Sequence, residues 1–517
     1  MAFLHIPVSP RLPCAPTALH RQAPHRQAPH RTAQRQRGAI AVMAAASVLL
    51  LLGMCGLALD VAQIYNRRME LQAIADAAAL AGAAQLDGTP DGVRNAVARA
   101  RAIVEEGNRT LRVRYNHTKV RLTDAAISFS ATPALDGSWT SAVPATNNDL
   151  LYVKVDTAEL DEAYGQVDGL FIQVLAPALA RSGVSTRAVA GRSSIKVAPI
   201  AVCAMSDSPG RRRDNPAFGD APANVELVQF GFRRGVSYDL MQLNPNGTTG
   251  EHFIVDPVTP PGRLGVAANV AGAAVAPFLC SGTMGVPRVS GGDITVSRPF
   301  PLAALYQTFN SRFGDYTGAL CESDGAPPDV NVKQYPHTAI GWMTNTIDGQ
   351  SARSLTSGNR LHTVADPDPV PGGNKPSEYG PLWAYARAVQ FASFEAGKPE
   401  SPSGYSTLPT SAWAALYRQD KSTAKSYPSG SGTPYATSNG NHFEAAPADH
   451  APGVRQRRVL NVLLLTCPVP AGELVQARVA GIGKFFMTVP ATSTTLIGEF
   501  GGLAWEGALG GPVELLQ

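Results

Sequence analysis

The sequence predicts an α+β protein whose long N-terminal helix spans a membrane and continues as a stalk, followed by a β-rich α+β domain with a large insertion. Three observations predict this architecture. Residues 38–59 contain no charged side chain, and no proline interrupts residues 38–86. The rest of the chain contains most of the 49 Gly and 41 Pro, which separate short apolar segments. Frequent Gly and Pro favour short strands and loops over long helices.

The uncharged run "GAIAVMAAASVLLLLGMCGLAL", residues 38–59, predicts a single transmembrane helix. At about 1.5 Å per residue, its 22 residues cross a hydrocarbon core of about 30 Å. Arg31, Arg35 and Arg37 precede it and Asp60 follows it, so the N-terminus is expected in the cytoplasm and the remainder outside. A cleaved signal peptide is the alternative, but no small-residue cleavage site followed by a break is present.

Residues 1–37 are predicted to form a disordered basic tail in the cytoplasm, because they repeat an Arg-, His-, Gln- and Pro-rich unit, "HRQAP". The first 59 residues hold six arginines and no acidic residue, whereas the whole chain has a net charge of +4. The body therefore carries a slight negative charge. This distribution argues against nucleic-acid binding by the body, in spite of the basic pI.

The absence of proline predicts that the helix continues well beyond the membrane. One helix over residues 38–86 would be about 70 Å long. In its exported part, apolar and small residues fall on one face at three-, four- and seven-residue steps; they are Ile64, Leu71, Ala75, Ala78 and Gly82. Small residues allow close helix packing. The partner of this face is either another protein's helix or the chain's own domain, and a second stalk helix is expected before residue 118.

The segment "QRGAIAVMAAASVLLLLGMCGLALDVAQIYNRRMELQAIADAAALAGA" resembles the N-terminal segment of Tad-type (Flp) pilus-assembly proteins, the TadE/TadG-like group. The features that match are the "RG" before the apolar run, "GLALDVAQIY", and the string from Leu71 to Ala83. Weaker resemblance continues over residues 150–194 and near the C-terminus. Prepilin-like members carry Glu at the fifth position after the processed Gly. Here that position after Gly38 is Met43, so prepilin-peptidase processing is not expected.

The resemblance implies a non-enzymatic component of Tad/Flp pilus assembly in a bacterial inner membrane, either minor pilin-like or part of the assembly platform, that supports adhesion and biofilm formation. It implies pilin-like proteins and the Tad secretion platform as partners, with a possible hetero-oligomer through the stalk helix. The C-terminal part would be periplasmic. We expect a helical stalk over residues 60–118, a split pilin-like α+β core from 119–203 and 454–517, and a Gly/Pro-rich insertion domain at 204–453.

Two other functions remain open. A membrane-displayed periplasmic adhesin or ligand-binding module would use residues 204–453, and a pocket lined by aromatic residues would favour it. A periplasmic enzyme would need a cleft that joins acidic or histidine residues distant in sequence. The sequence has no G-x-S-x-G, H-E-x-x-H, P-loop or dinucleotide motif. We therefore expect no enzymatic activity, no cofactor and no metal.

The six cysteines divide by their expected compartment. Cys14 falls in the tail and Cys55 in the membrane span, which leaves four exported cysteines. An even number in an oxidising compartment predicts two disulfides. We favour Cys203–Cys467, because these residues end the similar apolar segments "APIAVC" and "VLLLTC", and Cys280–Cys321. A zinc site is the rival, but the cysteines lack the C-x-x-C spacing.

Overall fold

The computed structural model describes residues 37–87, 90–106, 120–145, 150–336, 354–363, 365–366, 383–417, 426–428 and 432–516. The predicted tail, with Cys14 and apart from Arg37, lies outside the described residues. Two compact units are distinguished. One combines residues up to Gln63 with Asp168–Arg181, and the other comprises Ile64–Val167 and Ser182–Gln517.

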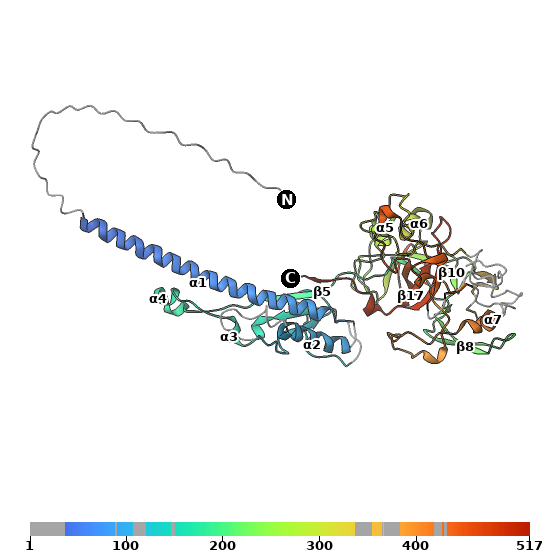
Figure 1. Cartoon of the computed structure of the whole chain (residues 1–517), viewed down its shortest axis with the longest axis horizontal. Coiled ribbons are helices and arrows are strands. Elements are labelled where there is room, and N and C mark those ends of the chain that lie inside the picture. Colours follow the sequence, from blue (N-terminus) through green and yellow to red (C-terminus); the bar gives the residue numbers. More distant parts are fainter. Residues whose placement is uncertain are drawn as a thin grey trace, which may run out of the picture. The chain divides into compact units, whose positions relative to one another are not determined.

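Helix α1 runs without interruption from Arg37 to Ala83, as the absence of proline predicts, and is the blue ribbon in Figure 1. Helix α2, Pro90–Glu106, begins on a proline, whose fixed φ suits the first helical position. The two helices approach closely at Gly82, where an added Cβ would lie 3.4 Å from the carbonyl oxygen of Ala96. The small residues of this stalk therefore allow α1 and α2 to pack backbone against backbone.

A four-stranded antiparallel sheet shares a core with these helices. Its order is β1 (Ile127–Ser130), β2 (Tyr152–Asp156), β5 (Arg187–Arg192) and β19 (Val513–Leu515). Alternate side chains such as Val153, Val155, Ala188 and Ala190 join α1 and α2 in one buried cluster. This two-layer arrangement of helices on a sheet matches the α+β expectation.

An eight-stranded sheet organises most of the remaining chain. Its order is β10 (Ser237–Asp239), β18 (Ile497–Leu503), β17 (Val479–Met487), β15 (Val459–Leu465), β6 (Ile200–Cys203), β11 (His252–Val255), β12 (Ile294–Ser297) and β16 (Leu474–Ala477). The central strand β15 is buried on both faces. Leu464 enters one hydrophobic cluster and Leu463 and Leu465 enter another, which explains its nearly continuous apolar sequence.

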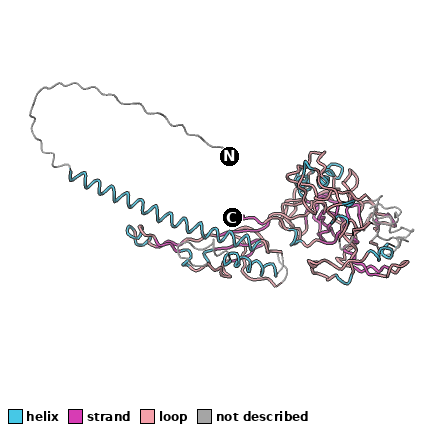
Figure 2. Tube along the Cα trace, viewed as in Figure 1, coloured by secondary structure: helices cyan, strands magenta, loops and turns pink. Residues whose placement is uncertain are grey.

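Shorter elements complete the described structure, and Figure 2 distinguishes its helices from its strands. The small sheets are β3 (Gln166–Asp168) with β4 (Arg181–Gly183), β7 (Arg211–Asn215) with β8 (Asn224–Gln229) and β9 (Phe232–Arg233), and β13 (Leu355–Ser357) with β14 (Arg360–His362). The helices are α3 (Glu162–Gly165), α4 (Ile172–Leu175), α5 (Gly272–Ser281), α6 (Leu302–Asn310) and α7 (Trp413–Tyr417).

Strand pairing crosses the domain boundaries expected at 203 and 454. Strands β10, β11 and β12 come from the expected insertion, yet they lie in one sheet with β6 and with β15–β18. The last strand, β19, does not join this sheet and pairs with β5 in the four-stranded sheet. The reason is that these partners are short strands far apart in sequence, so their local pattern does not specify their pairing.

Both expected cysteine pairs lie at disulfide distance. The Cα atoms of Cys203 and Cys467 are 5.6 Å apart, as are those of Cys280 and Cys321. The first pair joins two neighbouring parallel strands, because Cys203 of β6 lies opposite Leu465 of β15. Glu251 lies beside that pair, with an oxygen 3.8 Å from Cys203 Sγ. Since both sulfurs are in the disulfide, neither is available there as a thiolate ligand for zinc.

Candidate functional sites

The N-terminal half of α1 presents apolar side chains all round. Large side chains that are more than 40% exposed extend from Ile40 to Leu59; they are Ile40, Val42, Met43, Val48, Leu49, Leu50, Leu51, Leu52, Met54, Leu57 and Leu59. Among the described residues, α1 is the one helix whose length and composition suffice to cross a membrane. A helix that is hydrophobic on every side is typical of burial in lipid or in a large core.

The predicted packing face is used inside the protein. Leu71, Ala75, Ala78 and Gly82 are buried, and Ile64 is partly buried. Ala75 and Ala78 belong to the cluster formed with α2 and the four-stranded sheet. Sequence spacing thus located the face, but of the two partners left open, the structure places the chain's own domain against it.

A second apolar surface of α1, separate from this face, is exposed. Leu57, Val61, Tyr65 and Met69 are apolar, exposed and spaced four residues apart. Residues four apart are neighbours on a helix surface, so they form a continuous stripe. We name Leu57, Val61, Tyr65 and Met69 the outer stripe.

Asp60, at the end of the uncharged run, binds a loop instead of facing water. Its carboxylate accepts hydrogen bonds from the backbone N–H groups of Leu170 (3.0 Å), Phe171 (2.8 Å) and Ile172 (2.7 Å). One turn earlier, Gly56 faces the ring of Phe171, and a Cβ on Gly56 would overlap that ring. The sequence signals for this contact were the isolated Asp60, one turn after Gly56, and the uncharged run at 169–180.

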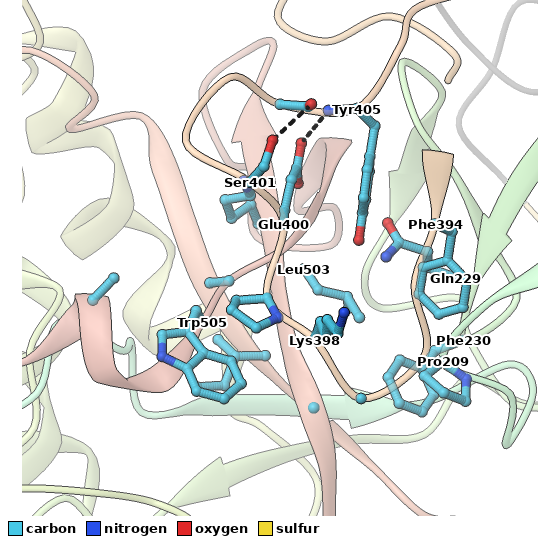
Figure 3. Close-up of a pocket in the computed structure, with 18 of the residues that line it drawn as sticks. Pro209, Gln229, Phe230, Phe394, Lys398, Glu400, Ser401, Tyr405, Leu503 and Trp505 are labelled. Atoms are coloured by element: carbon cyan, nitrogen blue, oxygen red, sulfur yellow. Dashed lines mark hydrogen bonds between the residues drawn. The ribbon is translucent and has the colours of Figure 1, made fainter. Parts of the chain in front are cut away.

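A cavity of about 560 Å³ lies beside strands β17 and β18 (Figure 3). Residues of β17 and the segment after β18 line one side, and the segment 394–405 lines the other. Phe230, Phe394, Tyr405 and Trp505 supply its aromatic surfaces. Its polar lining residues include Gln229, Lys398, Glu400, Ser401 and Lys484. An apolar cavity with a few polar groups is the usual form of a small-molecule site.

One ion pair holds the outer wall of this cavity. Arg234 donates from Nη1 to Glu400 Oε1 (3.0 Å) and from Nη2 to Glu400 Oε2 (2.7 Å). Glu400 also accepts the Tyr405 N–H (3.2 Å), and the Arg234 guanidinium lies 4.9 Å from the Tyr405 ring centre. Burial alone would raise the pKa of Glu400, but the hydrogen bonds and charge of Arg234 lower it. Glu400 is therefore a charged partner of Arg234 in the cavity wall.

Residues 38–85 match the family Tad, described as "Putative Flp pilus-assembly TadE/G-like". The match covers nearly the same residues as α1. We refer to residues 38–85 as the Tad segment. It supports a role in Flp pilus assembly and is consistent with membrane anchoring through α1. No curated protein and no solved structure matches the chain.

A second acidic group, outside the Tad segment, also has a structural role. Glu499 is fully buried in β18 and accepts N–H groups from Ala384 (2.7 Å), Tyr385 and Ala386 (both 2.8 Å). Burial raises the pKa of Glu499 to about 7, despite these hydrogen bonds, which lower it. Glu499 joins the chain at 384–386 to the sheet, and no histidine is among its hydrogen-bond partners described here.

Proposed function

We propose that the chain is a non-enzymatic component of Tad/Flp-type pilus assembly, anchored in the bacterial inner membrane, that supports adhesion and biofilm formation. The observation that supports this most is the coincidence of the Tad segment with a helix whose first half is apolar on every side. Its role is that of a minor pilin-like or assembly-platform subunit. Pilin-like proteins and the Tad secretion platform are its partners.

The outer stripe is the surface through which α1 meets these partners in a hetero-oligomer. The small-residue face is already buried against α2 and the four-stranded sheet, so it is not available. Leu57, Val61, Tyr65 and Met69 are exposed and continue the apolar surface of the membrane span. An exposed apolar surface that continues a membrane span is typical of helix association.

The proposed orientation puts the N-terminus in the cytoplasm and the C-terminal part in the periplasm. Arginine precedes the span and Asp60 follows it. The two disulfides support the same orientation, because disulfides persist in oxidising compartments. Their formation in cells is a direct test. Cys203 and Cys467 should resist alkylation unless a reductant is added first.

Photocrosslinking in cells tests the assembly role. A photoreactive residue at Tyr65, on the outer stripe, should capture pilin-like or platform proteins. The same residue at Ala75 should capture only the chain's own domain, because Ala75 is fully buried there. Deletion of the gene should remove pilin from the sheared surface fraction. Normal piliation in the deletion strain, with no pilus component captured at Tyr65, would refute the proposal.

A second function, as a ligand-binding module, is favoured by the cavity beside β17 and β18. Its aromatic walls suit a flat apolar group, and the amines of Lys398 and Lys484 suit a carboxylate. N-acetyl-phenylalanine carries both features and serves as the probe. Binding should change the fluorescence of Trp505 in the wild type and not in Trp505→Phe. If Lys484→Gln binds the probe equally well, the carboxylate assignment is wrong.

A further inference from the structure

The loop bound by Asp60 has an unusual composition. Residues 169–180, "GLFIQVLAPALA", contain no charge, whereas Asp168 and Arg181 stand on either side. Arg181 Nε lies 3.2 Å from Asp168 Oδ1, and the Gly169 N–H donates to the Ala180 oxygen at 2.8 Å. The segment is therefore an apolar tip on a narrow hairpin, β3–β4, with an ion pair at its base. We name residues 169–180 the apolar tip.

Large apolar side chains at this tip are exposed. Leu170 is 59% exposed and Phe171 is 43% exposed. The amide group of Gln173 donates to the Leu170 oxygen at 3.1 Å, within the tip. A loop that faces water usually presents polar side chains, with Gly or Pro at the turns. An apolar run of 10–14 residues is too short to span a membrane and belongs to a buried core helix or to an interfacial segment. The exposure of Leu170 and Phe171 favours the interfacial segment.

The backbone of the tip is also suited to a medium with little water. Asp60 accepts the N–H groups of Leu170, Phe171 and Ile172. The Ala176 N–H donates to the Ile172 oxygen at 2.7 Å, and the Ala180 N–H donates to the Pro177 oxygen at 3.2 Å. Backbone groups in lipid need such internal partners, because no water replaces them.

The position of the tip along α1 agrees with an interfacial location. Asp60 is 1% exposed and is the first charge after the uncharged run 38–59. Phe171 lies against Gly56, one turn further into that run. Residues 168–181 form one compact unit with α1 up to Gln63, and Figure 1 shows α4 beside α1. The tip therefore lies at the depth where the predicted membrane span ends.

We propose that the apolar tip inserts into the interfacial layer of the membrane beside the end of α1, so that lipid covers Leu170 and Phe171. The inference rests on the membrane anchoring proposed above. The tip has no basic residue, so insertion depends on apolar contact and does not require anionic lipid. Neighbouring helices and interfacial contacts set the rotation of a membrane helix about its axis. The inserted tip, 110 residues further along the chain from Asp60, therefore helps to fix which face of α1 is turned towards partners.

Depth-dependent fluorescence quenching tests the proposal on the full chain. Cys14→Ser and Cys55→Ala remove the unpaired cysteines, and Leu170→Cys carries an environment-sensitive label. Leu264→Cys is the aqueous control, because Leu264 is the same residue type and 63% exposed. Leu50→Cys, in the middle of the span, reports the anchor. Each protein is placed singly in nanodiscs of phosphatidylcholine alone. The bonds of residue 170 to Asp60 come from its backbone, so Leu170→Cys preserves them.

We expect lipids with a doxyl group near the headgroup to quench the label at position 170 strongly. We also expect dithionite to reduce the label at position 170 several-fold more slowly than the label at position 264. Reduction as fast as at position 264 would overturn the proposal. Protection from dithionite without quenching by doxyl lipid would also overturn it, because protein would then be the cover. If the label at position 50 is not quenched by lipid, the anchoring itself fails. That result is distinguishable from a failure of the tip alone.

Discussion

The disulfide Cys203–Cys467 should stabilise the protein more than Cys280–Cys321. Their sequence separations are 264 and 41 residues. If a disulfide acts mainly by restricting the unfolded chain, the two contribute about 5.5 and about 4 kcal/mol respectively. Because the shorter loop lies within the longer one, the effective length of the longer loop is reduced. The difference in the free energy of unfolding is then about 1.5 kcal/mol.

Packing does not separate the two pairs, so the prediction rests on loop length. Cys203 is fully buried and Cys467 is partly buried, whereas Cys280 and Cys321 are both buried. The test compares two double variants of the full chain in detergent micelles, Cys203→Ala with Cys467→Ala and Cys280→Ala with Cys321→Ala. Urea unfolding of each is followed by tryptophan fluorescence.

Trp383 and Trp413 make this fluorescence sensitive to the core, because both are fully buried and their ring centres are 4.1 Å apart. Cys55→Ala, which removes no disulfide, is the control and should unfold at the wild-type urea concentration. An equal or larger loss from Cys280→Ala with Cys321→Ala would refute the reasoning. The contribution of Cys203–Cys467 to the free energy of unfolding would then not be governed by the entropy of the unfolded chain.

Three further predictions concern single positions. Glu400→Gln should weaken the cavity wall by about 2 kcal/mol, since a buried guanidinium loses its charged partner, and hydrogen exchange at the Tyr405 amide should accelerate. Burial raises the pKa of Glu499 from an ordinary value of 4.5 to about 7, so its contribution to the free energy of unfolding should fall by about 3 kcal/mol as pH rises from 4.5 to 7. Urea titrations at pH 5 and pH 8 should show a smaller fall in the free energy of unfolding for Glu499→Gln. Ala75→Leu should destabilise the stalk domain by about 1–3 kcal/mol through overpacking, measured by thermal unfolding.

Controls separate these effects from general damage. Glu395→Gln changes an exposed carboxylate near the cavity and should leave exchange at Tyr405 unchanged. If the free energy of unfolding depends on pH equally in Glu499→Gln and in the wild type, groups other than Glu499 cause that dependence. For the stalk, Tyr65→Leu changes an exposed position on the same helix. If it destabilises as much as Ala75→Leu, the burial of Ala75 is not the cause.

The helix and the cysteine pairs could be predicted from sequence because their signals are local. Unbroken helical composition predicts α1 to within a few residues, and the apolar strands that end at Cys203 and Cys467 have the same pattern because they lie side by side. The partner of Ala75 could not be predicted, since a small-residue face specifies close approach without specifying what approaches.

The cavity and the Asp60 contact depend on long-range geometry. Phe394 and Trp505 are far apart in sequence, and both line the cavity only once the chain has folded. Asp60 is an ordinary flanking charge in the sequence, and its role depends on a loop more than 100 residues later. The uncharged run from 169 to 180 was the available signal for that loop.

Strand β19 has a consequence for the timing of synthesis and export. Residues 513–515 pair with β5, and Ser193 donates a hydrogen bond to Glu514, 321 positions later. In the orientation proposed above, the part of the chain after α1 is exported in sequence order, so β5 would remain an open sheet edge until that late segment arrives. Open edges recruit other strands. If that orientation holds, a ribosome that stalls before residue 513 leaves β5 as an unpaired sheet edge, which proteases and chaperones of the periplasm would recognise.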